Sequence, residues 1–248
     1  MHNIVALRRL PGKLLEFPLE ILKNSWHEAY RRKVIYFVIL PILTISGTLF
    51  ISRYDLRVSS RFQNAKAVNR ERYEIMKKVS KHGAFGGVAI FCGLILCAGG
   101  LCRSRRLVTA GLAGFLAAST AGLINNSLKL SGRPRPDARI EKNIKDGFYG
   151  PKFNKRGLPD ADFLSFPSGH SATAFGAATT VAILLPPMAV PAIVAAGAVA
   201  FSRVYILDHY PSDVFFGSMV GIICGAIFAV GNLPIREEQC KKSNLDLL

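Results

Sequence analysis

Long uncharged apolar stretches alternate along the chain with shorter polar segments that are rich in Lys and Arg. The apolar stretches cover residues 34–51, 83–102, 107–128, 171–202 and 214–235. A helix needs roughly 20 apolar residues to cross a lipid bilayer, and most of these stretches have about that length. The fourth is longer and holds Pro186 and Pro187 near its middle, which indicates two spans joined by a tight turn. The pattern therefore predicts an all-α integral membrane protein, built as a bundle of six transmembrane helices.

The polar segments predict elements that lie at the membrane surface. Between the first two spans, residues 52–81 carry many cations, with apolar residues near helical spacing. This predicts a basic amphipathic helix that rests on anionic headgroups or covers the mouth of a site; a charged connection without a ligand role is the alternative. We expect three parts: a membrane-surface segment (or a solvated leader) at 1–33, with Trp26 and Tyr30 at headgroup level, a six-span domain at 34–235, and a cytoplasmic tail at 236–248.

Composition narrows the class of protein. Half of the 248 residues are hydrophobic, yet 32 Lys and Arg against 16 Asp and Glu give a net charge of +16. Such an excess in a soluble protein favours nucleic acid, but here the charges are segregated from the apolar runs, so we expect a membrane and no nucleic acid. Most of the five cysteines lie in apolar runs and predict no disulfide framework. We expect no cleavable signal peptide, no metal, no cofactor and no obligate protein partner.

One polar motif points to phosphate chemistry. In the run Phe166-Pro167-Ser168-Gly169-His170, the serine can cap a helix and the glycine allows a ligand close to the backbone. The following helix N-terminus is a natural seat for a phosphate, to which His170 in its first turn can donate a proton. The alternative is an ordinary turn with a capping serine.

Two further segments join this motif if there are six spans. The loop after the third span contains Gly132-Arg133-Pro134-Arg135-Pro136, in which the prolines preclude a regular helix and hold two guanidinium groups near the surface. After the fifth span come Arg203, His209 and Asp213, and the carboxylate four residues beyond His209 can reach back to fix the imidazole tautomer. Six spans bring residues 129–170 and 202–213 to one membrane face, where they supply what phosphoryl transfer needs.

These residues resemble the type 2 phosphatidic acid phosphatase superfamily, helical membrane lipid phosphatases with the signature Lys-x6-Arg-Pro, Pro-Ser-Gly-His and Ser-Arg-x5-His-x3-Asp. The second part is Pro167–His170, and the third is Ser202, Arg203, His209 and Asp213. The first part departs from the signature, because Lys129 comes one residue too late before Arg135-Pro136. A local unwinding at Ser131-Gly132 can restore the reach of Lys129, or Arg133 can replace it.

The resemblance implies a mechanism. His209 would attack phosphorus to form a phosphohistidine, with Asp213 orienting it, while His170 protonates the leaving oxygen and later activates water. No metal is implied. The implied ligands of the phosphoryl oxygens are Arg135, Arg203, Ser168, the Gly169 N–H and either Lys129 or Arg133.

The substrate and the orientation are less closely defined. We expect a phosphorylated membrane lipid, first of all lipid A at its 1-phosphate; phosphatidylglycerol phosphate, undecaprenyl pyrophosphate and phosphatidate are the alternatives within the family. Two alternatives involve no hydrolysis: a lipid phosphotransferase, and a transporter or lipid-binding protein without catalysis. The positive-inside rule taken literally places the site in the cytoplasm, since the motif-bearing face carries more cations. The resemblance favours a bacterial inner-membrane protein with a periplasmic site.

Overall fold

The computed structural model describes residues 16–233, and these are folded almost entirely into helices. The described residues form no β-strand, only an isolated bridge between Phe153 and Pro159. The helices in chain order are α1 (Glu16–Arg31), the π-helix η2 (Ile35–Ile39), α2 (Leu40–Ser52), α3 (Asp55–Phe62), α4 (Ala65–Val68), α5 (Arg70–His82), α6 (Phe85–Leu101), α7 (Arg105–Leu128), the 3₁₀ helix η3 (Lys129–Ser131), α8 (Pro136–Glu141), the 3₁₀ helix η4 (Ala161–Phe163), α9 (Gly169–Leu184), the 3₁₀ helix η5 (Pro186–Met188), α10 (Ala189–Tyr205) and α11 (Pro211–Gly231).

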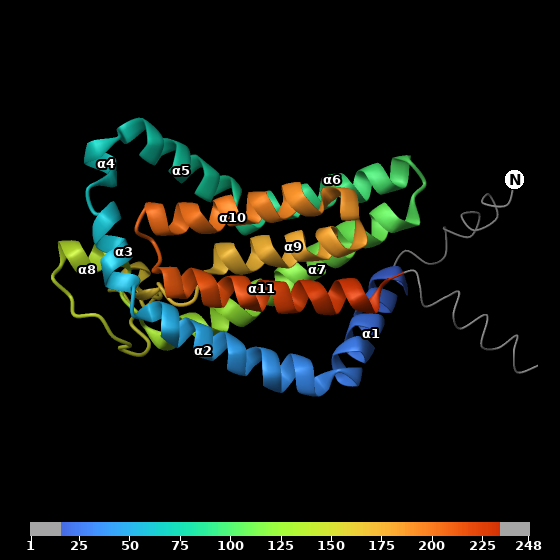
Figure 1. Ribbon diagram of the computed structural model, residues 1–248, viewed down its shortest axis with the longest axis horizontal. Coiled ribbons are helices and arrows are strands. Elements are labelled where there is room, and N and C mark those ends of the chain that lie inside the picture. Colours follow the sequence, from blue (N-terminus) through green and yellow to red (C-terminus); the bar gives the residue numbers. More distant parts are fainter. Residues whose placement is uncertain (1–15, 234–248) are drawn as a thin grey trace, which may run out of the picture.

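Helix α9 lies at the centre of the bundle and packs against α7, α10 and α11 (Figure 1). Small residues permit the close approach. A Cβ atom on Gly221 of α11 would lie 2.4 Å from the Ala172 carbonyl oxygen, and one on Gly225 would lie 2.6 Å from that of Gly176. Both distances are far below van der Waals contact, so only glycine fits. Gly221 and Gly225, four residues apart on α11, thus serve helix packing.

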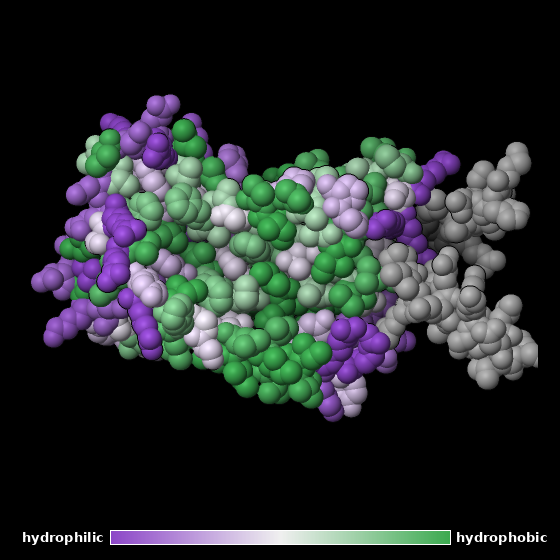
Figure 2. Space-filling view, in the orientation of Figure 1, coloured by the Kyte–Doolittle hydropathy of each residue, from purple (hydrophilic) through white to green (hydrophobic). Residues whose placement is uncertain are grey.

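On the face shown in Figure 2, a broad apolar zone lies between two polar ends of the bundle. Four described runs are long and apolar enough to cross a membrane: Ile35–Ser52, Arg105–Glu141, Pro186–Tyr205 and Pro211–Gly231. Helices α5 and α6 pass the same test together but meet at 60°, which allows up to five spans. The prediction of six spans is not confirmed, because the central helix α9 has only 16 residues.

The segment between the first two predicted spans differs from the single amphipathic helix that its spacing predicted. It forms α3, α4 and α5, with breaks at Asn64 and Asn69. The Asn69 side chain accepts a hydrogen bond from the Arg72 N–H (2.8 Å) and begins a new helix. Asparagine competes in this way with the backbone ladder, which explains the interruption at Asn69; Asn64 makes no such side-chain bond.

The predicted surface segment includes helix α1. Helix α1 leaves Trp26 and Tyr30 exposed and packs against α11 at the end of the bundle opposite α3 and α8 (Figure 1). Residues 1–15 and the predicted tail at 236–248 lie outside the described residues, so the three-part division stays a prediction.

Candidate active site

The Pro167–His170 motif lies at the N-terminus of α9, as its sequence predicts. Ser168 is the N-cap: its hydroxyl accepts hydrogen bonds from the Ser171 N–H (3.5 Å) and the Ser171 hydroxyl (2.9 Å). The Asn125 side-chain amide donates to the Ser168 carbonyl (3.0 Å) and holds the turn from α7. Gly169 and His170 follow, half-buried, where the first N–H groups of a helix have no intrahelical acceptor.

Lys129 reaches this turn despite its displaced position in the sequence. The last turn of α7 tightens into the 3₁₀ helix η3, and Gly132 then adopts a left-handed conformation with φ of 69°. A Cβ atom on Gly169 would lie 3.8 Å from the Lys129 ammonium nitrogen. The local change of helix at Ser131 and Gly132 therefore brings the lysine beside the α9 N-terminus.

Two guanidinium groups face each other across one carboxylate. The Oδ1 atom of Asp208 forms an ion pair with Arg135 (3.0 Å), and its Oδ2 atom forms one with Arg203 (2.6 Å). The Ser80 hydroxyl of α5 is a further hydrogen-bond partner of the Arg203 guanidinium. Asp208 and Ser80 were not singled out from the sequence; the position of Asp208 directly before His209 was the one available signal.

His209 is 2% exposed and lies in the turn between α10 and α11. Its Nδ1 contacts the carbonyl oxygen of Ser165. A carbonyl only accepts, so Nδ1 carries the proton in the neutral ring and Nε2 keeps its lone pair. This is the tautomer that an attacking imidazole requires.

Asp213 has different partners from those predicted. Its Oδ1 pairs with Arg133 (2.5 Å), and its Oδ2 accepts from the Ser165 hydroxyl (2.5 Å) and the Tyr210 N–H (2.9 Å). The expectation that Asp213 bonds the imidazole directly is wrong in this geometry, because the Ser165 carbonyl occupies Nδ1. The carboxylate instead holds Ser165, which in turn holds His209.

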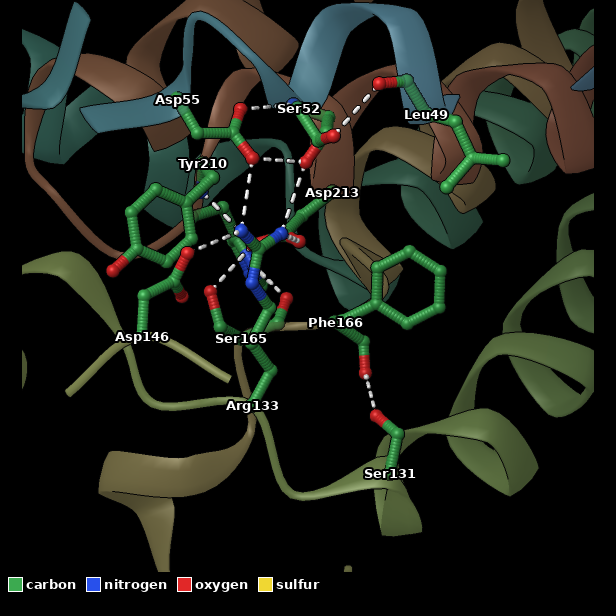
Figure 3. A network of polar contacts seen from close by, with 12 residues as sticks. Leu49, Ser52, Asp55, Ser131, Arg133, Asp146, Ser165, Phe166, Tyr210 and Asp213 are labelled. Atoms are coloured by element: carbon green, nitrogen blue, oxygen red, sulfur yellow. Dashed lines mark hydrogen bonds and ion pairs between the residues drawn. The ribbon is translucent and has the colours of Figure 1, made fainter. Parts of the chain in front are cut away.

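Arg133 also has partners other than those expected, because its guanidinium group pairs with carboxylates. Figure 3 shows its guanidinium enclosed by Asp55, Asp146 and Asp213. These carboxylates pair with the guanidinium group that the sequence offered as a possible phosphate ligand. Of the two alternatives for the first motif, the geometry favours Lys129.

Three cations set the electrostatics of both histidines, which lie outside the long apolar runs. Burial, followed by Arg203, Lys129 and Arg135, lowers the pKa of His170 from 6.5 to about 3. Burial and the same cations lower the pKa of His209 well below its ordinary value, while the Ser165 hydrogen bond opposes the shift. Both rings are therefore neutral at pH 7, and the three cations beside them suit an anionic group.

Residues 109–233 match the PAP2 superfamily. The chain belongs to this superfamily. The match begins in α7 and covers the helices that carry the site, so the resemblance of the three motifs to type 2 phosphatidic acid phosphatases is confirmed at the level of the family.

The chain matches curated relatives over part of its length. It is 34% identical over 114 residues to a lipid A 1-phosphatase of Rhizobium johnstonii, a match that covers 44% of each chain. It is 32% identical over 135 residues to a decaprenylphosphoryl-5-phosphoribose phosphatase of Mycobacterium tuberculosis, covering 50% of this chain and 60% of the relative. The matches thus span about half the length of these relatives.

A solved structure shares the fold. A transmembrane PAP2-type phosphatidylglycerolphosphate phosphatase from Bacillus subtilis superposes with a TM-score of 0.54 at 24% identity. The similarity covers 83% of this chain and 96% of the other. It therefore extends beyond the family match to the helices that precede α7.

Proposed function

We propose that the protein is a membrane lipid phosphatase that hydrolyses a phosphate monoester through a phosphohistidine on His209. The observation that carries the proposal is the tautomer of this buried imidazole, with Nδ1–H held by Ser165 and Nε2 free beside three cations. Lys129, Arg135 and Arg203 would hold the phosphoryl oxygens together with Ser168 and the Gly169 N–H. Developing charge on these oxygens would be stabilised without a metal.

The proposed reaction has two displacements. The Nε2 lone pair of His209 attacks phosphorus, the bond from phosphorus to the lipid oxygen breaks, and His170 supplies the proton to that oxygen. His170 then takes a proton from water, whose oxygen attacks the phosphohistidine and releases phosphate. A phosphate that arrives as the monoanion brings the proton for the first step, because His170 is neutral in the free site.

An apolar cavity supports a lipid as the substrate. A space of about 680 Å³ lies between α5, α6, α9 and α10, lined mainly by apolar side chains. Its lining includes Ala174, one turn after His170, and Val199, one turn before Arg203. One lipid could therefore place its headgroup phosphate beside the three cations and one apolar chain in this cavity.

Lipid A at its 1-phosphate is the leading substrate in this proposal. The similarity to lipid A 1-phosphatases supports it, as do the cations of the site-bearing end, which suit a polyanionic headgroup. The second candidate is a phosphorylated polyprenyl-linked sugar, favoured by the longer match to the mycobacterial phosphatase. The proposed setting is the bacterial inner membrane with a periplasmic site.

Phosphate release by the purified protein in detergent tests the proposal. The substrates are lipid A, a polyprenylphosphoryl pentose phosphate, phosphatidylglycerol phosphate, undecaprenyl pyrophosphate and phosphatidate. We expect the greatest kcat/KM on lipid A, with loss of the 1-phosphate, and no release by His209→Ala. Absence of release from every lipid would refute hydrolysis, and movement of the phosphoryl group to a second lipid would identify a transferase. A greater kcat/KM on the polyprenylphosphoryl pentose phosphate would favour the second candidate over lipid A.

A further inference from the structure

A buried ionic cluster lies behind the nucleophile, and the reaction outlined above assigns it no direct part. Arg133, 5% exposed, pairs with Asp213 (2.5 Å), Asp55 (2.9 Å) and Asp146 (3.5 Å) and donates to the Ser212 hydroxyl (2.9 Å). Its guanidinium carbon also lies 4.2 Å from the centre of the Tyr210 ring. Buried charges are costly unless their hydrogen bonds are satisfied, so this number of partners indicates a geometry that the fold holds closely.

Asp55 ties a distant part of the chain to this cluster. It is fully buried at the start of α3, and its Oδ1 accepts from the backbone N–H of Ser212 in the first turn of α11 (3.0 Å). Its Oδ2 accepts from Arg133 and from the Ser212 hydroxyl. The segment between the first two predicted spans is therefore anchored at the N-terminus of the helix that carries Asp213.

The cluster reaches the imidazole through one serine. Arg133 holds Oδ1 of Asp213, and Oδ2 of Asp213 holds the hydroxyl of Ser165, whose carbonyl accepts from Nδ1 of His209 (Figure 3 shows the cluster as far as Ser165). The same Oδ2 accepts from the N–H of Tyr210, directly after His209. One carboxylate thus fixes the backbone on both sides of the imidazole.

We propose that Arg133, Asp55 and Ser165 are positioning residues for His209. Asp55 holds Arg133, Arg133 holds Asp213, and Asp213 sets the Ser165 carbonyl that fixes the ring in the Nδ1–H tautomer. This inference rests on the proposed role of His209 as nucleophile. It accounts for Arg133, an arginine next to the first motif that pairs with carboxylates, and for the departure of Asp213 from a direct bond to the imidazole.

Ser165→Ala is the decisive variant, because it removes the hydroxyl bond while keeping the carbonyl and the Arg133–Asp213 pair. A misplacement of about 1 Å can cost about 100-fold in rate, so we expect kcat on the best lipid to fall at least tenfold. KM and inhibition by orthovanadate should stay within about twofold, since the cations are unchanged. Ser218→Ala is the matched control: it removes a buried serine hydroxyl of α11 that donates to a backbone carbonyl, that of Val214 (2.8 Å), and should keep wild-type kcat.

Arg133→Gln and Asp55→Asn extend the test along the cluster, and both should lower kcat more than they raise KM. Should Arg133→Gln fail to fold, Ser165→Ala decides the matter alone. Wild-type kcat in folded Ser165→Ala would overturn the proposal. So would an Arg133→Gln variant that loses orthovanadate inhibition with kcat intact, because this result would place Arg133 at the phosphate.

The imidazole itself gives a readout that needs no substrate. With ¹⁵N-labelled histidine in detergent, we expect His209 in the wild type to show one protonated Nδ1 and one unprotonated Nε2. Ser165→Ala should give a mixture of tautomers, and Ser218→Ala should not. An unchanged tautomer in Ser165→Ala would overturn the positioning role even if no lipid were hydrolysed, whereas a failure of hydrolysis in the wild type alone would count only against the proposed function.

Discussion

Replacing Lys129 by alanine tests the placement of the first-motif cation. The ammonium group lies beside the α9 N-terminus, 3.8 Å from where a Gly169 Cβ would be, and its charge acts on both His170 and His209. Loss of one group that stabilises developing charge commonly costs about 2–4 kcal/mol in the transition state. At about 1.36 kcal/mol per tenfold, we expect kcat/KM of Lys129→Ala to fall about 30- to 900-fold.

The assay is phosphate release from the best lipid, with orthovanadate inhibition as the measure of phosphate binding. Lys129→Ala should lose both. Lys145→Ala, which removes an exposed lysine from the following loop, is the control and should stay within about twofold of wild type. The reasoning would be refuted if Lys129→Ala kept more than a third of wild-type kcat/KM while Arg133→Ala lost orthovanadate inhibition.

The remaining predictions concern leaving group, pH, metal and lipid chain. His170→Ala should lose much less on a nitrophenyl phosphate than on a lipid phosphate, because general acid catalysis contributes roughly 10²–10⁴-fold only where the leaving oxygen needs a proton, whereas His209→Ala should be inactive on both; the opposite pattern would reverse the two roles. The acidic limb of kcat/KM that belongs to His209 should lie below pH 6.5, since burial and three cations lower its pKa and it attacks as the neutral ring; a limb above 6.5 that stays fixed when the phosphate pKa of the substrate changes would contradict this. Activity should survive exhaustive EDTA treatment, and loss that Mg²⁺ or Zn²⁺ restores would sink a metal-independent mechanism. Ala195→Phe, at an exposed position lining the apolar cavity, should raise KM for long-chain lipids but not short-chain ones, and Val194→Phe beside it should change neither.

The sequence supports the helical architecture and the site-bearing end of the bundle most strongly, because both depend on local patterns. Apolar runs predict helices wherever their side chains can face lipid or neighbouring helices. Ion pairs between Arg135 and Asp208, and between Arg133 and Asp213, confirm that the two motif-bearing regions meet. The number of spans is less accessible: α9 is short and central, and the bend between α5 and α6 depends on packing such as that of Gly83 against Val199.

Details of the site depend on contacts between distant segments, which spacing within a motif does not reveal. Asp55 lies 78 residues before Arg133, and no pattern near it announces the pairing. The spacing suggested that Asp213 would reach His209. Both carboxylate oxygens instead accept hydrogen bonds from other donors, namely Arg133, Ser165 and Tyr210. The reach of Lys129 was foreseen only as one alternative, since it required the tightened turn of η3.

Trapping the phosphoenzyme tests the central claim most directly. The protein is mixed with lipid A labelled in its 1-phosphate, quenched in alkali within milliseconds to seconds, and digested for mass spectrometry. We predict an acid-labile, alkali-stable phosphoryl group on the peptide that carries His209. It should be most abundant in His170→Gln mixed with a nitrophenyl phosphate, whose leaving group needs little protonation while hydrolysis of the phosphohistidine is slowed. A phosphoryl group on another residue, or none in a variant that still releases phosphate, would contradict the phosphohistidine mechanism.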